Sequence, residues 1–276
     1  MAESAVSAES MARLSPLKFI RSQMASDVTA QSPQQARKRW AETLFYPTLR
    51  MAMRRQFHSI LLAGGDRMRE ATREGSAIAG SNHTNWWDGF VLSWVTRRAT
   101  PECGFLLAMD EANLARYGFF RKLGVFGVDL RSGRTAALAL RRLVPALQAS
   151  REFCWIFPQG ELLHPTRPID ARGGAGWLAR KANIPLLPVA LSYEWLIESR
   201  PSILIRAGEI VPATTPAKDF SELLMQLRWQ IVQDAADLQL DDYTPILSPR
   251  LSLNKQWDRV RGLWRGQGGR VDRFNR

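Results

Sequence analysis

Short apolar runs alternate with longer amphipathic stretches between about residue 75 and residue 209. The short runs predict strands and the amphipathic stretches predict helices. The predicted strands are Ala77–Gly80, Gly104–Met109, Val125–Leu130, Phe153–Phe157, Leu186–Leu191 and Ile203–Ala207. The predicted helices are Asn85–Arg97, Asn113–Leu123, Arg134–Ser150, Gly174–Ala182 and, beyond the alternation, Lys218–Leu238. This order predicts an α/β fold with a mixed, largely parallel sheet flanked by helices.

The N-terminal part of the chain has a different pattern. Residues 1–33 are rich in Ala, Ser and Gln without steady periodicity, which predicts a mobile tail with one short helix around residues 16–24. Residues 34–75 form a basic, amphipathic helical segment, with a helix predicted over Gln35–Leu62. Its apolar positions are Trp40, Leu44, Phe45, Leu49 and Met53. Such a helix suits either a membrane interface or ordinary packing on the domain.

The rest of the chain divides into a main domain over residues 76–245 and a basic C-terminal extension over residues 246–276. The extension interleaves Trp257 and Trp264 with Lys and Arg side chains. That pattern suits a lipid surface or an RNA, and a solvated tail is an equally simple interpretation.

The charge and the cysteine content limit the classes of binding partner and the cellular compartment that are expected. The formal net charge is +12 and the pI about 10.6, which favours nucleic acid, anionic lipid or acidic substrates and carriers. Cys103 and Cys154 lie far apart and form no CxxC pair, as expected in a reducing compartment. The sequence contains no uninterrupted run of about 18 apolar residues, so no transmembrane helix is predicted. The three histidines and two cysteines show no zinc-type spacing, so no metal is expected.

The chemistry centres on His83 and Asp88, which directly follow the predicted strand Ala77–Gly80. Asn85 is a suitable N-cap, so Asp88 is predicted at the third helical position, where the helix dipole favours a carboxylate. A turn between them could fold the imidazole onto the carboxylate. His83 would then be a general base oriented by Asp88, without a protein nucleophile. A helix-start carboxylate and a structural histidine are the alternative interpretation.

Four ordered segments add a family resemblance. Asn82–Asp88, Phe119–Arg131, Phe157–Glu161 and Ile184–Ala190 resemble, in that order, the motifs of the PlsC-like glycerolipid acyltransferase family, whose first motif is H-x4-D and whose third is F-P-E-G. The resemblance covers about residues 76–192 and implies that the domain over residues 76–245 is an acyltransferase domain.

The resemblance also implies the substrates and the setting. The donor would be acyl-CoA or an acyl carrier protein, the acceptor a lipid alcohol, and no cofactor would be needed. His83 would be the base and Asp88 its orienter, and Gly160 would allow close backbone approach to the substrate. The protein would act peripherally on the cytoplasmic side of a membrane with an anionic surface. An acyl carrier protein is a further candidate partner because it is acidic, and no nucleic acid is expected.

The third motif departs from the family pattern. Gln159 replaces the glutamate, and Glu161 and Leu162 stand where relatives have Thr-Arg. In relatives that acylate phosphorylated glycerols, that arginine is associated with the phosphate of the acceptor. Arg131 and Arg172 are candidate replacements, while Gln159 and Glu161 could hydrogen-bond a sugar or another neutral alcohol. The acceptor therefore stays open among phosphorylated, glycosylated and other hydroxylated lipids.

Rival interpretations remain at the sequence level. A non-catalytic basic protein that binds an anionic membrane or RNA would explain the charge and the altered third motif. His164 is a rival base without a well-placed carboxylate, and His58 is expected to be structural. A serine hydrolase lacks its G-x-S-x-G elbow.

Overall fold

The computed structural model describes residues 32–248 of the 276-residue chain. The predicted N-terminal tail up to residue 31, including the short helix around residues 16–24, lies outside these residues. So do residues 249–276 of the predicted C-terminal extension, with Trp257 and Trp264.

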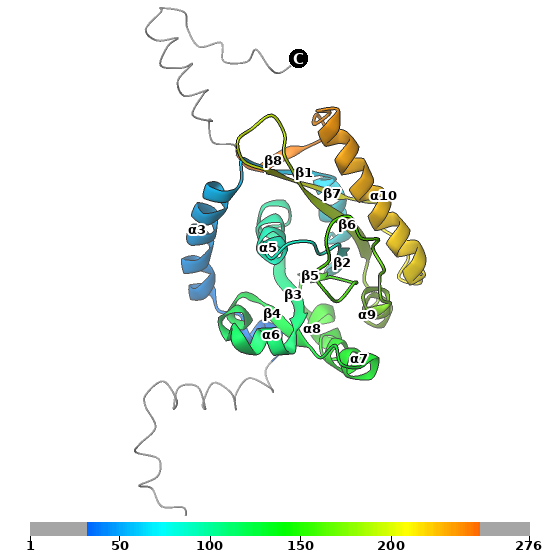
Figure 1. The fold of residues 1–276 in the computed structure, drawn as a ribbon. Helices are drawn as coiled ribbons and strands as arrows, with labels where there is room; N and C mark the ends of the chain where they lie inside the picture. The colour runs from blue at the N-terminus through cyan, green and yellow to red at the C-terminus, as the bar shows by residue number, and fades with distance from the viewer. Residues whose placement is uncertain (1–31, 249–276) are drawn as a thin grey trace, which may run out of the picture.

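One eight-stranded sheet runs through the molecule in the order β4-β3-β5-β2-β6-β7-β1-β8 (Figure 1). The strands are β1 (Ile60–Ala63), β2 (Ala77–Ser81), β3 (Gly104–Asp110), β4 (Val125–Val128), β5 (Glu152–Ile156), β6 (Leu186–Glu194), β7 (Ser202–Ala207) and β8 (Thr244–Leu247). Neighbours are parallel except the pairs β6–β7 and β1–β8. The predicted mixed, largely parallel α/β sheet is confirmed.

Helices cover both faces of this sheet. They are α2 (Pro33–Ala36), α3 (Arg39–Gln56), α4 (Gly65–Ala71), α5 (Asp88–Ala99), α6 (Glu111–Arg116), the 3-10 helix η2 (Gly118–Leu123), α7 (Gly133–Arg141), α8 (Val144–Ala149), α9 (Gly174–Ala182) and α10 (Ala217–Ala236). Strand alternation divides the core: Ala77 and Ala79 pack with α3, α4 and α5, whereas Ile78 packs with α7 to α10. The central strands are therefore buried on both sides, as parallel strands usually are.

Two strands escaped the sequence prediction. The helix predicted over Gln35–Leu62 is wrong at its end, because α3 stops at Gln56 and Ile60–Ala63 is strand β1. β1 pairs with β7, more than 140 positions along the chain, as in the register Ile60↔Ile203, and β8 pairs with β1. Four-residue strands carry too little periodicity to be recognised without these partners. The sheet thus extends across the limits predicted at residues 75 and 245.

Helix α3 also differs from its predicted amphipathic pattern. Leu49 and Met53 are buried and pack on the core, with Phe45 partly buried beside them. Trp40 and Leu44 instead project outward, with 54% and 66% of their surfaces exposed. The helix therefore has one apolar face on the domain and a second apolar stripe toward the surroundings.

A buried ion pair anchors the start of α3. Arg37 makes two hydrogen bonds to Glu152 at the start of β5, of 2.7 and 3.2 Å, and the Glu152 side chain is only 2% exposed. The space is so tight that a Cβ on Gly104 would lie 1.9 Å from the Glu152 carboxylate and 2.0 Å from Arg37. At the other end, Arg200 donates to the Arg54 carbonyl at 2.7 Å. Helix α3 is thus fastened at both ends.

We predict that Arg37→Met destabilises the protein by about 3 kcal/mol, because it leaves the buried Glu152 carboxylate without its cation. The free energy of unfolding from urea titration measures this. The double variant Arg37→Met/Glu152→Met should recover most of the loss, since it removes both charges. Arg73→Met is the matched control, because the Arg73 side chain is 68% exposed. Equal unfolding midpoints for wild type and Arg37→Met would contradict the prediction.

Candidate active site

Hydrogen bonds from Asn82 hold the start of the loop that follows β2 against strand β6. β2 lies between β5 and β6, and the Asn82 side chain exchanges two hydrogen bonds with the backbone of Leu191, of 3.0 and 2.9 Å. Asn82 is 1% exposed, so its amide completes a strand-like pairing where β2 itself has ended. His83 therefore starts from a rigid base at the carboxyl end of a central strand.

His83 and Asp88 are in contact. His83 Nδ1 lies 2.9 Å from Asp88 Oδ2, and the same oxygen accepts hydrogen bonds from the backbone N–H groups of Thr84 and Asn85, at 2.7 and 2.9 Å. The Asp88 side chain is fully buried, whereas that of His83 is 22% exposed. Asp88 is also the first residue of α5, where the helix dipole stabilises negative charge.

The local turn differs from the predicted helix start. α5 begins at Asp88 and not near Asn85, so Asp88 is not at the third helical position. The Asn85 side chain accepts from the backbone N–H of Trp87 at 3.0 Å, which shapes a turn instead of capping the helix. This turn brings the imidazole back over the carboxylate.

Tyr193 on β6 is a third member of this cluster. Its hydroxyl donates to Asp88 Oδ1 at 2.6 Å, so the carboxylate accepts four hydrogen bonds in all. Burial, then the nearby Asp88 charge and the hydrogen bond to it, raise the pKa of Tyr193 far above its usual value. Sequence reasoning missed Tyr193, because it lies 105 positions from Asp88 and only the register of β6 brings it there.

The third motif supports His83 from the other side. The Phe157 ring stacks against the imidazole, with centroids 4.0 Å apart and planes 12° from parallel. Gln159 Oε1 accepts from the backbone N–H of His83 at 3.1 Å, and the backbone N–H of Leu163 donates to the His83 carbonyl at 3.0 Å. Gln159 is 4% exposed, so it holds the His83 loop and does not reach the cavity.

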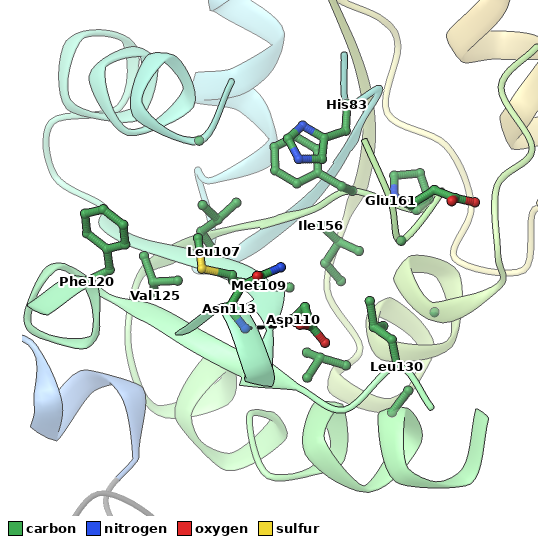
Figure 2. A pocket seen from close by; sticks show the side chains of 18 of the residues that line it. His83, Leu107, Met109, Asp110, Asn113, Phe120, Val125, Leu130, Ile156 and Glu161 are labelled. Carbon is green, nitrogen blue, oxygen red and sulfur yellow. Dashed lines mark hydrogen bonds between the residues drawn. The ribbon is translucent and has the colours of Figure 1, made fainter. Parts of the chain in front are cut away.

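A cavity of about 730 Å³ opens beside His83. Its lining is mainly apolar and aromatic, contributed by α3, α5, α6, η2, α7, α9 and the strands β3 and β4. Figure 2 shows His83 and Glu161 at one end, while Phe120 and Leu130 lie further along. This volume and lining are typical of a site for an apolar ligand with a few convergent polar groups.

The predicted substrate-binding residues separate into two groups. Gly160, Glu161 and Arg172 line the cavity with His83, and Gly160 adopts a positive φ of 76° that suits glycine. Arg131 is not among the lining residues. Its side chain is 90% exposed and pairs with Asp129 at 2.7 Å, and hydrogen bonds from Arg131 lower the pKa of Asp129 to about 2.

The other two histidines lie elsewhere. His164 is exposed and contacts Thr166 at 2.9 Å, and within residues 32–248 no carboxylate pairs with it. His58 Nδ1 lies 3.8 Å from Glu198 near the β6–β7 connection. Neither histidine lines the cavity.

Between residues 32 and 248, no cluster of three or more His, Cys, Asp or Glu side chains could hold a metal ion. Over the same stretch, no helix combines the length and apolarity needed to cross a membrane.

The arrangement defines what His83 can do chemically. In the tautomer whose Nδ1–H donates to Asp88, the imidazole keeps the lone pair of Nε2 for a proton. Asp88 would also stabilise the imidazolium formed when that proton is taken. The pair therefore has the geometry of an imidazole oriented by a carboxylate, and His83 lines an apolar cavity.

Residues 65–192 match the family model described as Acyltransferase. Among solved structures, the chain is similar to the 1-acyl-sn-glycerophosphate (LPA) acyltransferase PlsC from Thermotoga maritima, with 15% identity and a TM-score of 0.47. That similarity covers 80% of this chain and 89% of that chain. No curated protein matches the sequence.

The raised pKa of Tyr193 predicts an alkaline loss of stability. Above about pH 10 an unfolded tyrosine loses its proton while the folded Tyr193 keeps it, so the unfolded state binds fewer protons and stability falls as pH rises. The slope of unfolding free energy between pH 10 and 11.5 should be shallower in Tyr193→Phe, by up to about 1.4 kcal/mol per pH unit. Tyr117→Phe, at a half-exposed position, should keep the wild-type slope. A Tyr193→Phe slope as steep as that of wild type would refute the assignment.

Proposed function

We propose that the protein transfers a fatty acyl group from a thioester donor to a hydroxyl of a lipid acceptor, as the match of residues 65–192 to the Acyltransferase family model suggests. The observation that carries the proposal is the His83–Asp88 pair, joined at 2.9 Å, at one end of an apolar cavity. The donor is acyl-CoA or an acyl carrier protein, both of which present the same thioester.

In the proposed reaction, His83 Nε2 accepts the proton of the acceptor hydroxyl as its oxygen attacks the thioester carbonyl. The tetrahedral intermediate then collapses and expels the thiolate, which takes the proton back from the imidazolium. Asp88 holds the ring through Nδ1 and stabilises its positive charge, and Tyr193 and the two loop N–H groups hold Asp88. General-base assistance of this kind contributes roughly 10²- to 10⁴-fold in rate.

The rest of the cavity supports the assignment of the substrates. Its apolar and aromatic walls suit an acyl chain, whose burial releases about 0.8 kcal/mol for each CH₂ group. Gly160, Glu161 and Arg172 lie at the His83 end, where the acceptor headgroup would be held. Gln159 is assigned to positioning the base, since it is buried behind the loop.

His83→Ala is expected to lower kcat for acyl transfer at least a hundredfold, because it removes the proton acceptor. Transfer from a radiolabelled acyl thioester to extracted lipids, followed by mass spectrometry of the product, measures this. His164→Ala is the matched control and should retain activity, since His164 lies outside the cavity. A folded His83→Ala protein with ordinary turnover would refute the proposed base.

We also propose that the protein lies peripherally on an anionic membrane at the cytoplasmic side. The outward stripe of α3 supports this: Trp40, Leu44, Pro47 and Met51 follow one another at helical spacing and are all exposed. Arg39, Arg50 and Arg55 are exposed on the same helix. Apolar anchors beside cations are the chemistry of an interfacial helix. Two free cysteines fit a reducing compartment.

The double variant Trp40→Gln/Leu44→Gln should weaken binding to vesicles of phosphatidylcholine and phosphatidylglycerol at least tenfold, because it removes two anchors from the interface. Vesicle flotation measures the bound fraction. The control is Trp229→Gln, since Trp229 is 63% exposed on α10, at the opposite side of the molecule (Figure 1). Unchanged flotation of the double variant would rule out the stripe as the contact surface.

A further inference from the structure

Two opposite charges flank the turn next to His83. The guanidinium of Arg172 packs over Gly160, close enough that a Cβ there would lie 3.1 Å from Arg172 Nη1. Glu161 follows Gly160 directly, and both charged residues line the cavity. Both residues are exposed to solvent, and among residues 32–248 no ion pair joins Glu161 to Arg172 or joins either side chain to another charge. A carboxylate and a guanidinium are thus both available to a ligand at one site.

The other charges of the cavity lie on different elements. Asp110 and Arg116 come from the start and end of α6, and the Asp110 carboxylate accepts the backbone N–H of Asn113 as a helix cap. In Figure 2, Asp110 and Asn113 lie apart from the end that holds His83 and Glu161. The charge pattern next to the base is therefore set by Glu161 and Arg172.

We infer that the acceptor has a dipolar headgroup, with an ammonium group for Glu161 and a phosphate or carboxylate for Arg172. This inference rests on the proposed acyl transfer and names the acceptor class. A headgroup with both charges pairs each side chain with its opposite, and charge-assisted hydrogen bonds are the stronger kind.

Glu161 and Arg172 together would disfavour the binding of acceptors whose headgroups lack one of the two charges. A headgroup with a phosphate alone would satisfy Arg172 and place its negative charge near the Glu161 carboxylate, with repulsion as the result. Leu162 lines the cavity as well and offers such a phosphate no donor. A neutral sugar would offer a counter-ion to neither side chain, so it would lack the charge-assisted hydrogen bonds of a dipolar headgroup.

The test compares lysophosphatidylethanolamine with its N-acetyl derivative, which loses the ammonium charge and keeps the phosphate. Transfer kinetics with a saturating acyl thioester give kcat/KM for each acceptor. Binding of each lysolipid below its micellar concentration is measured by isothermal titration calorimetry. Lysophosphatidate and a glucosyl monoacylglycerol complete the panel. The variants are Glu161→Gln, Arg172→Gln and, as a control, Glu74→Gln, whose side chain is 90% exposed.

Wild type and Glu74→Gln should bind and acylate the amine at least tenfold better than the N-acetyl derivative. Glu161→Gln should abolish this preference, mainly by raising KM for the amine. Arg172→Gln should weaken the binding and acylation of both lysophosphatidylethanolamine and its N-acetyl derivative. Equal use of the amine and its N-acetyl derivative by wild type, or an unchanged ratio in Glu161→Gln, would overturn the dipolar acceptor while leaving acyl transfer standing. Absence of any His83-dependent thioester cleavage would instead overturn the proposed function, and the acceptor assignment with it.

Discussion

The buried carboxylate of Asp88 is the interaction on which the site depends. It lies at the start of α5 and accepts hydrogen bonds from His83, from two loop N–H groups and from Tyr193 on β6. A loop, a helix and a strand therefore meet at one group with no exposed surface. Burying a carboxylate is costly unless its oxygens are satisfied, and these donors satisfy them. The orientation of the imidazole follows from that requirement, because His83 is one of the donors.

The sheet positions His83 and Asp88, and helix α3 forms part of the cavity wall beside them. Central strands fix the bases of the loops that carry His83 and the third motif, and the Phe157 ring supports the imidazole from below. Helix α3 closes the apolar cavity with Phe45 and Tyr46, while its outer stripe faces away from the domain. His83 thus lies between a polar hydrogen-bond network and a large apolar cavity, which is the combination typical of a ligand site with a few convergent polar groups.

Much of this could be predicted from local patterns. The six strands around the site appear as separate apolar runs, and His83, Asp88 and the third motif stand out because they are close in sequence or fall in ordered motifs. Tyr193, β1 and β8 could not be predicted, because each depends on pairing between distant segments. Arg131 shows the opposite error: a basic residue at the end of a motif strand pairs with its neighbour Asp129 and turns to solvent. Gln159 is buried and accepts a hydrogen bond from the His83 backbone, a contact that its residue type alone does not reveal.

The ion pair between Arg37 and Glu152 shows that the folded unit begins before the region that matches the family model. The family match begins at residue 65, yet the folded unit reaches back to the guanidinium that neutralises Glu152. A protein shortened to residues 65–192 would lose Phe45 and Tyr46 from the cavity wall and would leave the buried Glu152 carboxylate without the Arg37 cation. Expression of the folded domain therefore has to start upstream of position 37, although residues 37–64 contain none of the family motifs.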